Sequence, residues 1–562
     1  MPVSQTRVRV LFVLFLVASS LLAVRLTQWQ AIDRGRLASL ATAQVRSDEL
    51  IPAQRGIIRD RNGAILATTV ELRSLYAIPS RVKDKAATAA ALGVLLGRDP
   101  KPILDRLSSG AEWTFIHRRL PEAAAKAIAA LGIEGLGFET EPKRVYPNDQ
   151  VAAHLLGFVN DDGVGVYGVE GAYDDVLRGT PGRLVVERDP SARALPVGLR
   201  HAVPARDGAE LTLTIDLVIQ HAAERELAAA IAKEKAAAGT IVVLDPKDGA
   251  ILALASYPTF DPSAVAVSDP EALRDRAIAW AFEPGSTLKS ITVAAALDAG
   301  LVTPATTYND VGYAVIGGRR LNNALGKVWG PTTVTQVLER SANAGAVFVA
   351  SKLGAERLHA ALATFGLGRK TGVDLAGEIG GRVRPLAEWY PVDVGTAAFG
   401  QGLTTTPLQL ASAYAALANG GILYRPHAVA SRRDADGEHR TEPVAIRRAV
   451  APETAAAMRA MLTSTVDNGL AQNARLAAFS VAGKTGTAQI PDAAGSYESD
   501  QYISSFAGFA PADDPRFVAV VVLERPESRI LGTLTATSAF KGLALDVLRT
   551  ARVQPDRAGA RP

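Results

Sequence analysis

Ser286 and Lys289 carry the strongest chemical signal in the sequence. They lie three residues apart in Glu283-Pro284-Gly285-Ser286-Thr287-Leu288-Lys289, ahead of an apolar run that ends at Gly300. Because Pro and Gly interrupt the preceding structure, we predict a helix that begins at or near Ser286 and carries both side chains on one face. The helix N-terminus would favour negative charge on the serine oxygen and leave backbone N–H groups free for an oxyanion. Apolar walls would lower the pKa of Lys289, so that a neutral amine could deprotonate Ser286.

The Ser-x-x-Lys spacing alone does not identify this site. Three such pairs occur, Ser80/Lys83, Ser286/Lys289 and Ser538/Lys541. Only Ser286 combines a Pro-Gly entry with a following apolar segment that would bury the lysine. Taken by itself, the pair remains open to two interpretations, a catalytic unit or an ordinary helix start.

A hydroxyl and a carboxamide two positions apart occur at Ser341-Ala342-Asn343, after a predicted helical stretch from Thr332 to Arg340. Both side chains could face one cleft from the corner between helix and loop. The hydroxyl of Ser341 could then relay a proton, and the amide of Asn343 could bind a substrate carbonyl. The alternative is a simple turn or helix cap, which Ser and Asn also favour.

Lys-Thr-Gly occurs twice, at Lys370–Gly372 and at Lys484–Gly486, where Thr487 follows. The first copy comes after a helix that ends in glycines, so we assign it to a surface loop. The second lies among small residues just before the last pair of strands. Small residues on an edge strand let a ligand backbone approach closely, and Lys484 with neighbouring threonine hydroxyls could hold a carboxylate.

Composition excludes several classes of function. The chain has no cysteine, which removes disulfides, thiolate nucleophiles and thiolate metal sites. Its seven histidines show no His-Glu-x-x-His pairing, so we expect neither a metal nor a cofactor. The net charge is only +4, without long basic runs, and nucleic-acid binding is therefore not expected.

The N-terminus predicts export. Arg7 and Arg9 precede an uncharged run from Val10 to Val24, and Arg25 closes it. Snorkelling of the arginines extends the run, and we predict a cytoplasmic tail at 1–9 and a membrane-spanning signal-anchor at 10–26. The alternative is a cleaved signal peptide, for which Ala41-Thr42-Ala43 offers a site, although it lies far beyond the apolar run.

Residues 27–207 predict a structural domain, because they offer no nucleophile, base and oxyanion donor together. Segments 57–58 and 64–67 flank Asn62-Gly63, a hairpin signal. Residues 83–131 predict alanine-rich helical segments, whereas the glycine-dense stretch 157–182 predicts loops and turns.

Residues 208–551 predict one α+β domain. Segments 240–244 and 250–254 form a hairpin signal, 503–510 and 517–523 form another, and mostly helical sequence lies between them. Strands at both ends of a helical middle indicate an antiparallel sheet that distant segments close, flanked by helices. A final helix is expected at about 539–549, and 552–562 reads as a disordered tail.

Ser-x-x-Lys, Ser-x-Asn and Lys-Thr-Gly, in that order, are shared by β-lactamases and penicillin-binding proteins. The resemblance is strongest to class B penicillin-binding proteins, and it implies a transpeptidase domain behind a single transmembrane helix and an elongated pedestal domain of the dimerisation type. In the catalytic half it rests on Glu283–Lys289, Ser341–Gly345, Phe399–Gly402 with Thr406–Leu410, and Ala482–Gln489. In the pedestal it rests on 52–56 with 60–63, and on 144–147 with His154 and Gly157.

The resemblance implies a peptidoglycan D,D-transpeptidase. Ser286 would attack the penultimate D-alanine carbonyl of a donor stem peptide, and Lys289 would take the serine proton. Ser341 would pass a proton to the departing D-alanine, and Asn343 would hold the donor amide. The terminal carboxylate would bind Lys484, Thr485, Gly486 and Thr487, and the backbone N–H groups of Ser286 and Thr487 would form the oxyanion hole. β-Lactams would mimic the donor and trap Ser286.

The resemblance also suggests a branch, a location and partners. With Asn at position 343, the motif resembles that of the cell-division branch, because the elongation branch usually carries Asp there. Ala342 departs from the Ser or Asp that the family usually has in the middle of this motif. Such enzymes sit in the cytoplasmic membrane as single-pass proteins with the catalytic domain outside, at the septum, beside a SEDS-family glycosyltransferase and other division proteins. Three alternatives stay open: an elongation-type enzyme, a β-lactamase or D,D-carboxypeptidase, and a non-enzymatic division scaffold.

Overall fold

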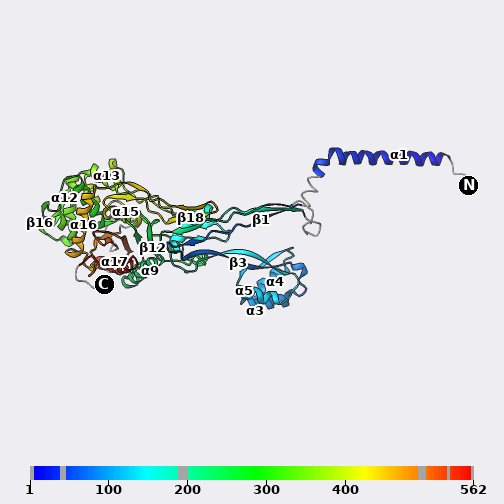
Figure 1. The fold of residues 1–562 in the computed structure, drawn as a ribbon, viewed down its shortest axis with the longest axis horizontal. Helices are drawn as coiled ribbons and strands as arrows, with labels where there is room; N and C mark the ends of the chain where they lie inside the picture. The colour runs from blue at the N-terminus through cyan, green and yellow to red at the C-terminus, as the bar shows by residue number, and fades with distance from the viewer. Residues whose placement is uncertain (1–4, 38–45, 188–199, 491–500, 528–531, 558–562) are drawn as a thin grey trace. The chain divides into compact units, whose positions relative to one another are not determined.

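A computed structural model describes residues 5–37, 46–187, 200–490, 501–527 and 532–557 (Figure 1). The chain divides into two compact units, Met1–Gln54 with Gly179–Gly208, and Arg55–Arg178 with Ala209–Pro562. The first unit contains a long N-terminal helix and an antiparallel sheet in the order β1-β8-β9. Its elements are α1 (Gln5–Thr27), a π-helical turn η1 (Gln28–Ile32), β1 (Arg46–Ile51), β8 (Gly182–Glu187) and β9 (Arg200–Val203).

The helical segment Gln5–Ile32 is long and apolar enough to cross a membrane, and it is the one such segment in the part of the chain that the structure describes. Its apolar side chains, such as Leu11 and Phe15, are exposed rather than packed into a protein core. The uncharged run that predicts a signal-anchor therefore forms a helix, as a membrane anchor requires.

A mixed sheet begins the second unit, with strands in the order β19-β18-β10-β2-β3-β4 and β5 paired with β3. The predicted hairpin is confirmed, because β2 and β3 pair antiparallel around Asn62-Gly63, where Gly63 has a φ of +90°. β18 comes from the far end of the chain, so the sheet combines segments from both predicted domains. The strands are β2 (Ile58–Arg59), β3 (Ile65–Ala77), β4 (Thr114–Leu120), β5 (Leu136–Val145), β10 (Glu210–Leu213), β18 (Val429–Asp434) and β19 (Gly437–Arg440).

Three short helices pack beside β3, as Figure 1 shows: α3 (Lys85–Leu96), α4 (Pro100–Ser108) and α5 (Glu122–Ala130). These are the predicted helical segments of 83–131, but strand β4 at Thr114–Leu120, between α4 and α5, was not predicted. This segment is rich in β-branched and aromatic residues, and it buries Ile116 and Leu120 against the helices. The strand forms because it pairs with β3, and β3 lies too far away in the sequence for local patterns to reveal this partner.

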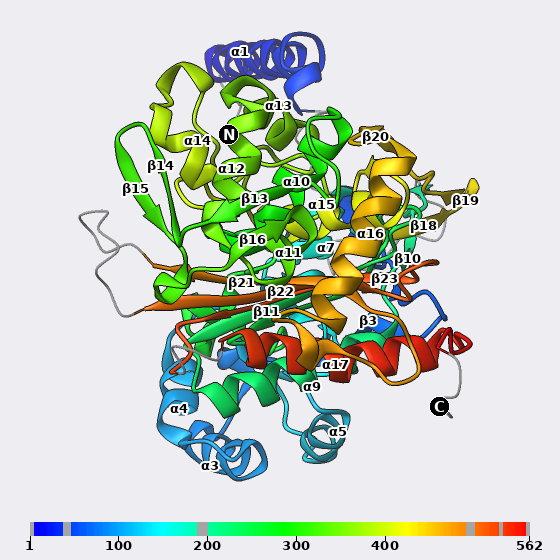
Figure 2. The same cartoon turned by 90° about the vertical axis from the view of Figure 1, so that its left-hand side faces the viewer.

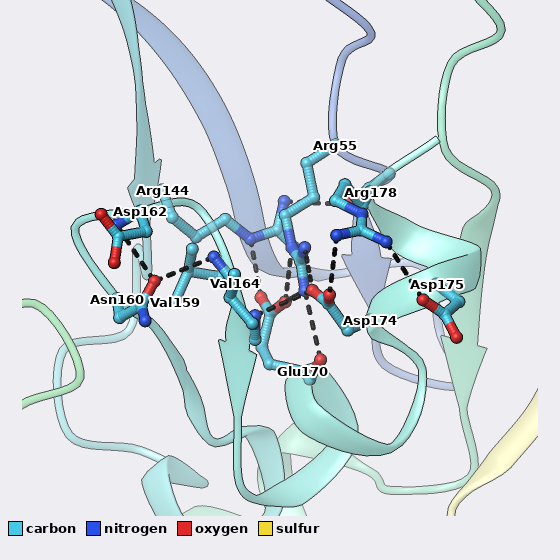
Figure 3. A network of polar contacts seen from close by, with 12 residues as sticks. Arg55, Arg144, Val159, Asn160, Asp162, Val164, Glu170, Asp174, Asp175 and Arg178 are labelled. Atoms are coloured by element: carbon cyan, nitrogen blue, oxygen red, sulfur yellow. Dashed lines mark hydrogen bonds and ion pairs between the residues drawn. The ribbon is translucent and has the colours of Figure 1, made fainter. Parts of the chain in front are cut away.

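The glycine-dense stretch forms turns and very short elements around a buried network of charges (Figure 3). Glu170 is fully buried and its carboxylate accepts hydrogen bonds from Arg55 Nε and Arg144 Nε, each at 2.7 Å. Arg55 also donates to Asp174 at 2.7 Å, and Arg144 donates to the carbonyl of Gly56 at 2.8 Å. The elements here are α6 (Ala153–Leu156), β6 (Phe158–Val159), β7 (Gly165–Val166), α7 (Gly168–Ala172) and α8 (Asp174–Leu177).

We expect Glu170→Gln to destabilise the protein strongly. The substitution keeps the side-chain volume but leaves the buried guanidinium of Arg144 without its counter-charge and that of Arg55 with Asp174 alone, a change that costs about 3–5 kcal/mol. In a unit of this size the melting temperature would fall by about 5–10 °C in calorimetry. Asp175→Asn is the matched control, because Asp175 is exposed and pairs only with Arg178 among the described residues. A shift for Glu170→Gln no larger than the control's would contradict this structural role.

A five-stranded antiparallel sheet forms the centre of the second unit, in the order β12-β11-β23-β22-β21. Both predicted hairpins are present, and distant segments close the sheet as expected, because β11 pairs with β23. The strands are β11 (Ala238–Leu244), β12 (Ile251–Tyr257), β21 (Ala482–Gln489), β22 (Tyr502–Ala510) and β23 (Phe517–Glu524).

Both faces of this sheet are covered by helices (Figure 2). Alternate residues of β23 explain why: Val518, Val520 and Val522 join one core, whereas Phe517, Ala519, Val521 and Leu523 join the other. A strand that is buried on both faces is apolar throughout, without alternation. The second core contains α9 (Leu217–Glu234) and α17 (Gly532–Thr550), and the first contains α10 (Lys289–Asp298) and α15 (Pro407–Ala418).

The segment between the hairpins contains the predicted helices, together with long loops and three small strand pairs outside the mixed sheet. Its helices are α11 (Val334–Glu339), α12 (Asn343–Leu353), α13 (Ala355–Thr364), α14 (Pro391–Ala397) and α16 (Pro452–Asp467). Its short strands outside the mixed sheet are β13 (Thr307–Asp310), β14 (Tyr313–Ile316), β15 (Arg319–Asn322), β16 (Gly330–Thr333), β17 (Ile422–Tyr424) and β20 (Ala445–Arg448). Its 3-10 turns are η3 (Val265–Val267), η4 (Pro270–Leu273), η5 (Gly285–Leu288), η6 (Ala324–Gly326), η7 (Leu386–Glu388) and η8 (Gln472–Ala474); η2 (Pro79–Arg81) precedes α3.

The tail predicted to be disordered is bound where the structure describes it. Asp556 accepts a hydrogen bond from Ser480 N at 2.7 Å, and Arg557 pairs with Asp467 at 2.7 Å. Val553 packs against the core beneath α17. The prediction of disorder was therefore wrong for 553–557, whose polar composition conceals these specific partners; residues 558–562 lie outside the described residues.

Candidate active site

Ser286 lies in the 3-10 turn η5, directly before α10, so the predicted helix start is confirmed. Lys289 is the first residue of α10 and is completely buried, whereas Ser286 is partly exposed. Gly300, just after α10, has a φ of +66° and ends the helix as expected. The nucleophile and base candidates therefore share one rigid turn.

Two glycines let the chain pack closely behind Ser286. Gly285 has a φ of +54° and donates its N–H to the carbonyl of Gly400 at 3.1 Å. A Cβ on Gly400 would lie 2.2 Å from Gly285 O, so only glycine fits there. Glu283 strengthens the contact, because its Oε1 accepts a hydrogen bond from Gly402 N at 2.9 Å. The Phe399–Gly402 stretch thus supports the Ser286 turn.

The hydrogen bonds of Lys289 show how its amine is oriented. Nζ lies 2.6 Å from the carbonyl oxygen of Ser341 and 2.7 Å from Oδ1 of Asn343. Both atoms only accept hydrogen bonds, so Lys289 must donate to them. Ser286 Oγ lies 3.0 Å from the same nitrogen. A neutral amine has two hydrogens; once both are donated to these acceptors, its lone pair is left for a hydroxyl, and Ser286 Oγ at 3.0 Å is nearer than Ser341 Oγ at 3.2 Å.

Burial lowers the pKa of Lys289 well below its usual range, and the nearby charge of Lys484 lowers it further. Lys484 is also buried, and burial lowers its pKa to about 7. No buried carboxylate contacts either amine among the described residues. Two cations in one dry site oppose each other's protonation, so Lys289 loses its proton before Lys484 does.

Ser341 occupies the corner between α11 and α12 with a φ of +54°, a conformation that is uncommon for a side-chain-bearing residue. Its Oγ lies 3.2 Å from Lys289 Nζ and 3.0 Å from Lys484 Nζ, so the hydroxyl bridges the two amines. Asn343 begins α12 and donates through Nδ2 to the carbonyl of Asn322 at 3.0 Å. Five predicted site residues thus meet around one point.

The second Lys-Thr-Gly lies on β21, which is the terminal strand of the central sheet. A Cβ on Gly486 would lie 2.9 Å from Thr287 Cγ2 and 3.0 Å from the carbonyl of Pro284, so glycine lets the strand approach the Ser286 turn. Thr487 is exposed, whereas Thr485 is nearly buried. Both threonines line a cleft of about 800 Å³ together with Ser286, Ser341 and Asn343.

The other matches to these short motifs lie elsewhere. Ser80 is exposed in η2, and Lys83 pairs with Glu134 at 3.2 Å. Ser538 donates to its own helix at Leu534 O, 2.6 Å away. In the first Lys-Thr-Gly, Thr371 N and Gly372 N bind the carboxylate of Glu378, which makes that copy a closed loop. Spacing alone therefore selects wrong pairs, and the flanking residues are needed.

Comparison with known proteins identifies the family. A family model for the penicillin-binding protein transpeptidase domain matches residues 239–543, and one for the penicillin-binding protein dimerisation domain matches 50–213. Stage V sporulation protein D of Bacillus subtilis is 34% identical over 98% of this chain and 86% of its own length. The peptidoglycan D,D-transpeptidase FtsI of Escherichia coli is 32% identical, over 93% and 87%. The chain belongs to the class B penicillin-binding proteins.

Solved structures agree with this family. Penicillin-binding protein 3 from Mycobacterium tuberculosis, complexed with aztreonam, is 29% identical and superposes with a TM-score of 0.71 over 91% of this penicillin-binding protein and 98% of that chain. A peptidoglycan synthetase from Bifidobacterium adolescentis gives 0.74 at 27% identity, over 92% and 98%. The predicted fold class and the enzyme class, a serine-type D-Ala-D-Ala transpeptidase, are confirmed for this penicillin-binding protein.

Sequence reasoning missed the residues that hold the active-site turns in place. Tyr414 is fully buried in α15 and donates to the carbonyl of Thr287 at 2.8 Å, beside Ser290 Oγ. Asn323 accepts from Ala344 N at 2.9 Å and donates to Asp310, which anchors the start of α12. A tyrosine in a helix composed mainly of alanine and leucine was an available signal for the first residue. Backbone contacts such as those of Asn323 leave no such pattern.

Proposed function

We propose that this transpeptidase cross-links stem peptides through an acyl-enzyme on Ser286. Lys289, as a neutral amine, takes the hydroxyl proton while Ser286 Oγ bonds to the carbonyl carbon of the penultimate D-alanine. The peptide bond to the terminal D-alanine breaks, and Ser341 passes the proton held by Lys289 to the departing amine. An amine from a neighbouring stem then attacks the ester carbonyl; the ester bond breaks, and the proton of this amine passes through Lys289 to Ser286 Oγ, which forms the cross-link and restores the hydroxyl and the neutral lysine.

The remaining site residues bind the donor. Asn343 holds the donor amide, and the terminal carboxylate is recognised by Lys484, Thr485, Gly486 and Thr487. The backbone N–H groups of Ser286 and Thr487 stabilise the oxyanion; the close approach of β21 to Gly285, where a Cβ would lie 3.0 Å from Thr487 O, supports this pairing. β-Lactams bind the same groups and acylate Ser286.

The single observation that carries this function is the position of Lys289 Nζ, which lies 3.0 Å from Ser286 Oγ while it donates to the carbonyl of Ser341 and to Oδ1 of Asn343. The test is a peptide ending in D-Ala-D-Ala, supplied with an amine acceptor. We expect release of D-alanine, transfer of the peptide to the amine, and loss of both after stoichiometric benzylpenicillin. Hydrolysis of bound penicillin within seconds would instead indicate a β-lactamase.

The acylation rate should depend on pH through both lysines. It rises as Lys289 loses its proton, and it falls above about pH 7, where Lys484 loses the charge that binds a carboxylate. On this alkaline limb kcat/KM for a carboxylate-bearing β-lactam should fall about tenfold per pH unit. Lys484→Arg keeps its charge throughout and should remove the limb, as stopped-flow acylation can measure. If kcat/KM of this variant still fell above about pH 7, Lys484 would not be the group whose charge binds the carboxylate.

We further propose a single-pass membrane protein with a cytoplasmic tail at 1–9, a transmembrane signal-anchor at 10–26, a pedestal domain at 27–207 and a transpeptidase domain at 208–551. Its catalytic domain lies outside the cytoplasmic membrane at the division septum. Asn343 at the third motif position supports the division branch, and a SEDS-family glycosyltransferase with other division proteins would be the partners. Depletion should give filamentous cells, and a fluorescent fusion should collect at midcell. Rounded cells would indicate elongation instead.

A further inference from the structure

One rim of the active-site cleft is cationic. Arg320, Lys327 and Arg340 line it, and no aspartate or glutamate does so among the residues that the structure describes. Within those same residues, none of the three cations forms an ion pair. They lie on β15, after η6 and at the end of α11, and Figure 2 shows β15 and α11 on one side of the central sheet.

Aromatic and neutral groups fix the positions of these cations. Lys327 Nζ lies 5.3 Å from the ring centre of Trp329, and the guanidinium carbon of Arg340 lies 5.1 Å from the same ring. Arg340 also donates to Thr332 Oγ1 at 3.0 Å. Two cations gathered on one indole repel each other, so this arrangement costs free energy until an anion joins it.

Arg320 is held in the same way. Its guanidinium carbon lies 3.7 Å from the ring centre of Tyr313, and its Nε donates to Asn322 Oδ1 at 3.0 Å. Asn322 is also the residue whose carbonyl accepts from Asn343 Nδ2. The catalytic asparagine therefore adjoins the segment that carries the cations.

The direction of the donor peptide follows from these contacts, given the proposed function, on which this inference rests. The donor's terminal carboxylate lies at β21 and its amide at Asn343. The residues that precede D-Ala-D-Ala then run from Asn343 toward segment 320–329. A side chain at that position meets the cationic rim, defined as Arg320, Lys327, Arg340 and Trp329.

We propose that the cationic rim binds a free carboxylate on the side chain of the residue that precedes D-Ala-D-Ala in the donor stem. The rim is thus a specificity subsite for an acidic stem peptide, separate from the groups that read the terminal carboxylate. An amidated side chain would keep one acceptor oxygen and lose the other, together with the charge–charge attraction.

The test compares N-acetyl-Glu-D-Ala-D-Ala with N-acetyl-Gln-D-Ala-D-Ala on the full chain in detergent, with D-alanine release as the readout. We expect kcat/KM to favour the glutamyl peptide about fivefold, as partly exposed charge pairs allow. Lys327→Gln should bring the ratio close to one, and Lys327→Arg should preserve it. The ratio is internal to each variant, so a general loss of activity or fold cancels.

Arg319→Gln is the matched control, because Arg319 is an exposed arginine adjacent to Arg320 on β15 and does not line the cleft. It should leave the preference unchanged. Equal rates for the two peptides in the unmodified chain, or a preference that survives Lys327→Gln, would overturn the proposal. No D-alanine release from either peptide, together with no penicillin labelling, would overturn the proposed function and this inference with it.

Discussion

Ser286→Ala should abolish covalent labelling by a fluorescent penicillin while shifting the melting temperature by no more than about 1–2 °C. The substitution removes the one oxygen that Lys289 can deprotonate at 3.0 Å, and it deletes a single hydrogen bond from a partly exposed side chain. Ser341 also contacts both buried lysines, but it lies in the corner between α11 and α12 rather than at the helix start before α10, so we expect no substitute nucleophile.

Labelling on a denaturing gel, with calorimetry on the same preparations, measures both effects. Ser80→Ala is the matched control, since Ser80 has the same spacing to a lysine but is exposed in η2. It should label at the rate of the unmodified chain. Persistent labelling of Ser286→Ala would exclude this serine as the nucleophile.

Lys289→Met should slow acylation by about 10²–10⁴-fold, the usual contribution of a general base. Methionine has a similar length and suits a fully buried site, so the turn should persist. Because burial depresses the pKa of Lys289 in the fold, its protonated form opposes folding at every pH below the unfolded pKa. Replacing it with an apolar side chain should therefore not lower the melting temperature.

Lys289→Arg separates a base from a positive charge. A guanidinium stays protonated at every accessible pH, so it can pair with a serine oxygen but cannot take its proton. We expect this variant to be as slow as Lys289→Met in stopped-flow acylation by penicillin. Recovery of the rate with arginine would show that charge, rather than proton transfer, is the contribution of Lys289.

The sequence predicted the reacting turn well because its determinants are local. Pro284 and Gly285 set the entry to α10, and the apolar run after Lys289 determines that the lysine is buried. The central sheet was also predictable, since β11, β12, β22 and β23 are apolar runs separated by clear turn residues. Local composition and spacing contain these features directly.

Other parts depend on contacts between distant segments. The bridge from Lys484 to Ser341 spans 143 positions, and only the family resemblance placed these two residues in one site. Strand β4 was missed because β3 provides its pairing partner. The ordered conformation of residues 553–557 was missed because it depends on contacts with Ser480 and Asp467, which lie elsewhere in the sequence. The cationic rim was overlooked, since its members become neighbours only around Trp329.

Peptide mapping by mass spectrometry after reaction with benzylpenicillin is the most direct measurement. Trypsin should release the segment from Ala277 to Lys289, which contains one serine. We predict that this peptide carries the intact drug as an ester on Ser286. A drug adduct on Ser341 or on any other residue, or the absence of an adduct, would contradict a mechanism that begins with Ser286 and Lys289.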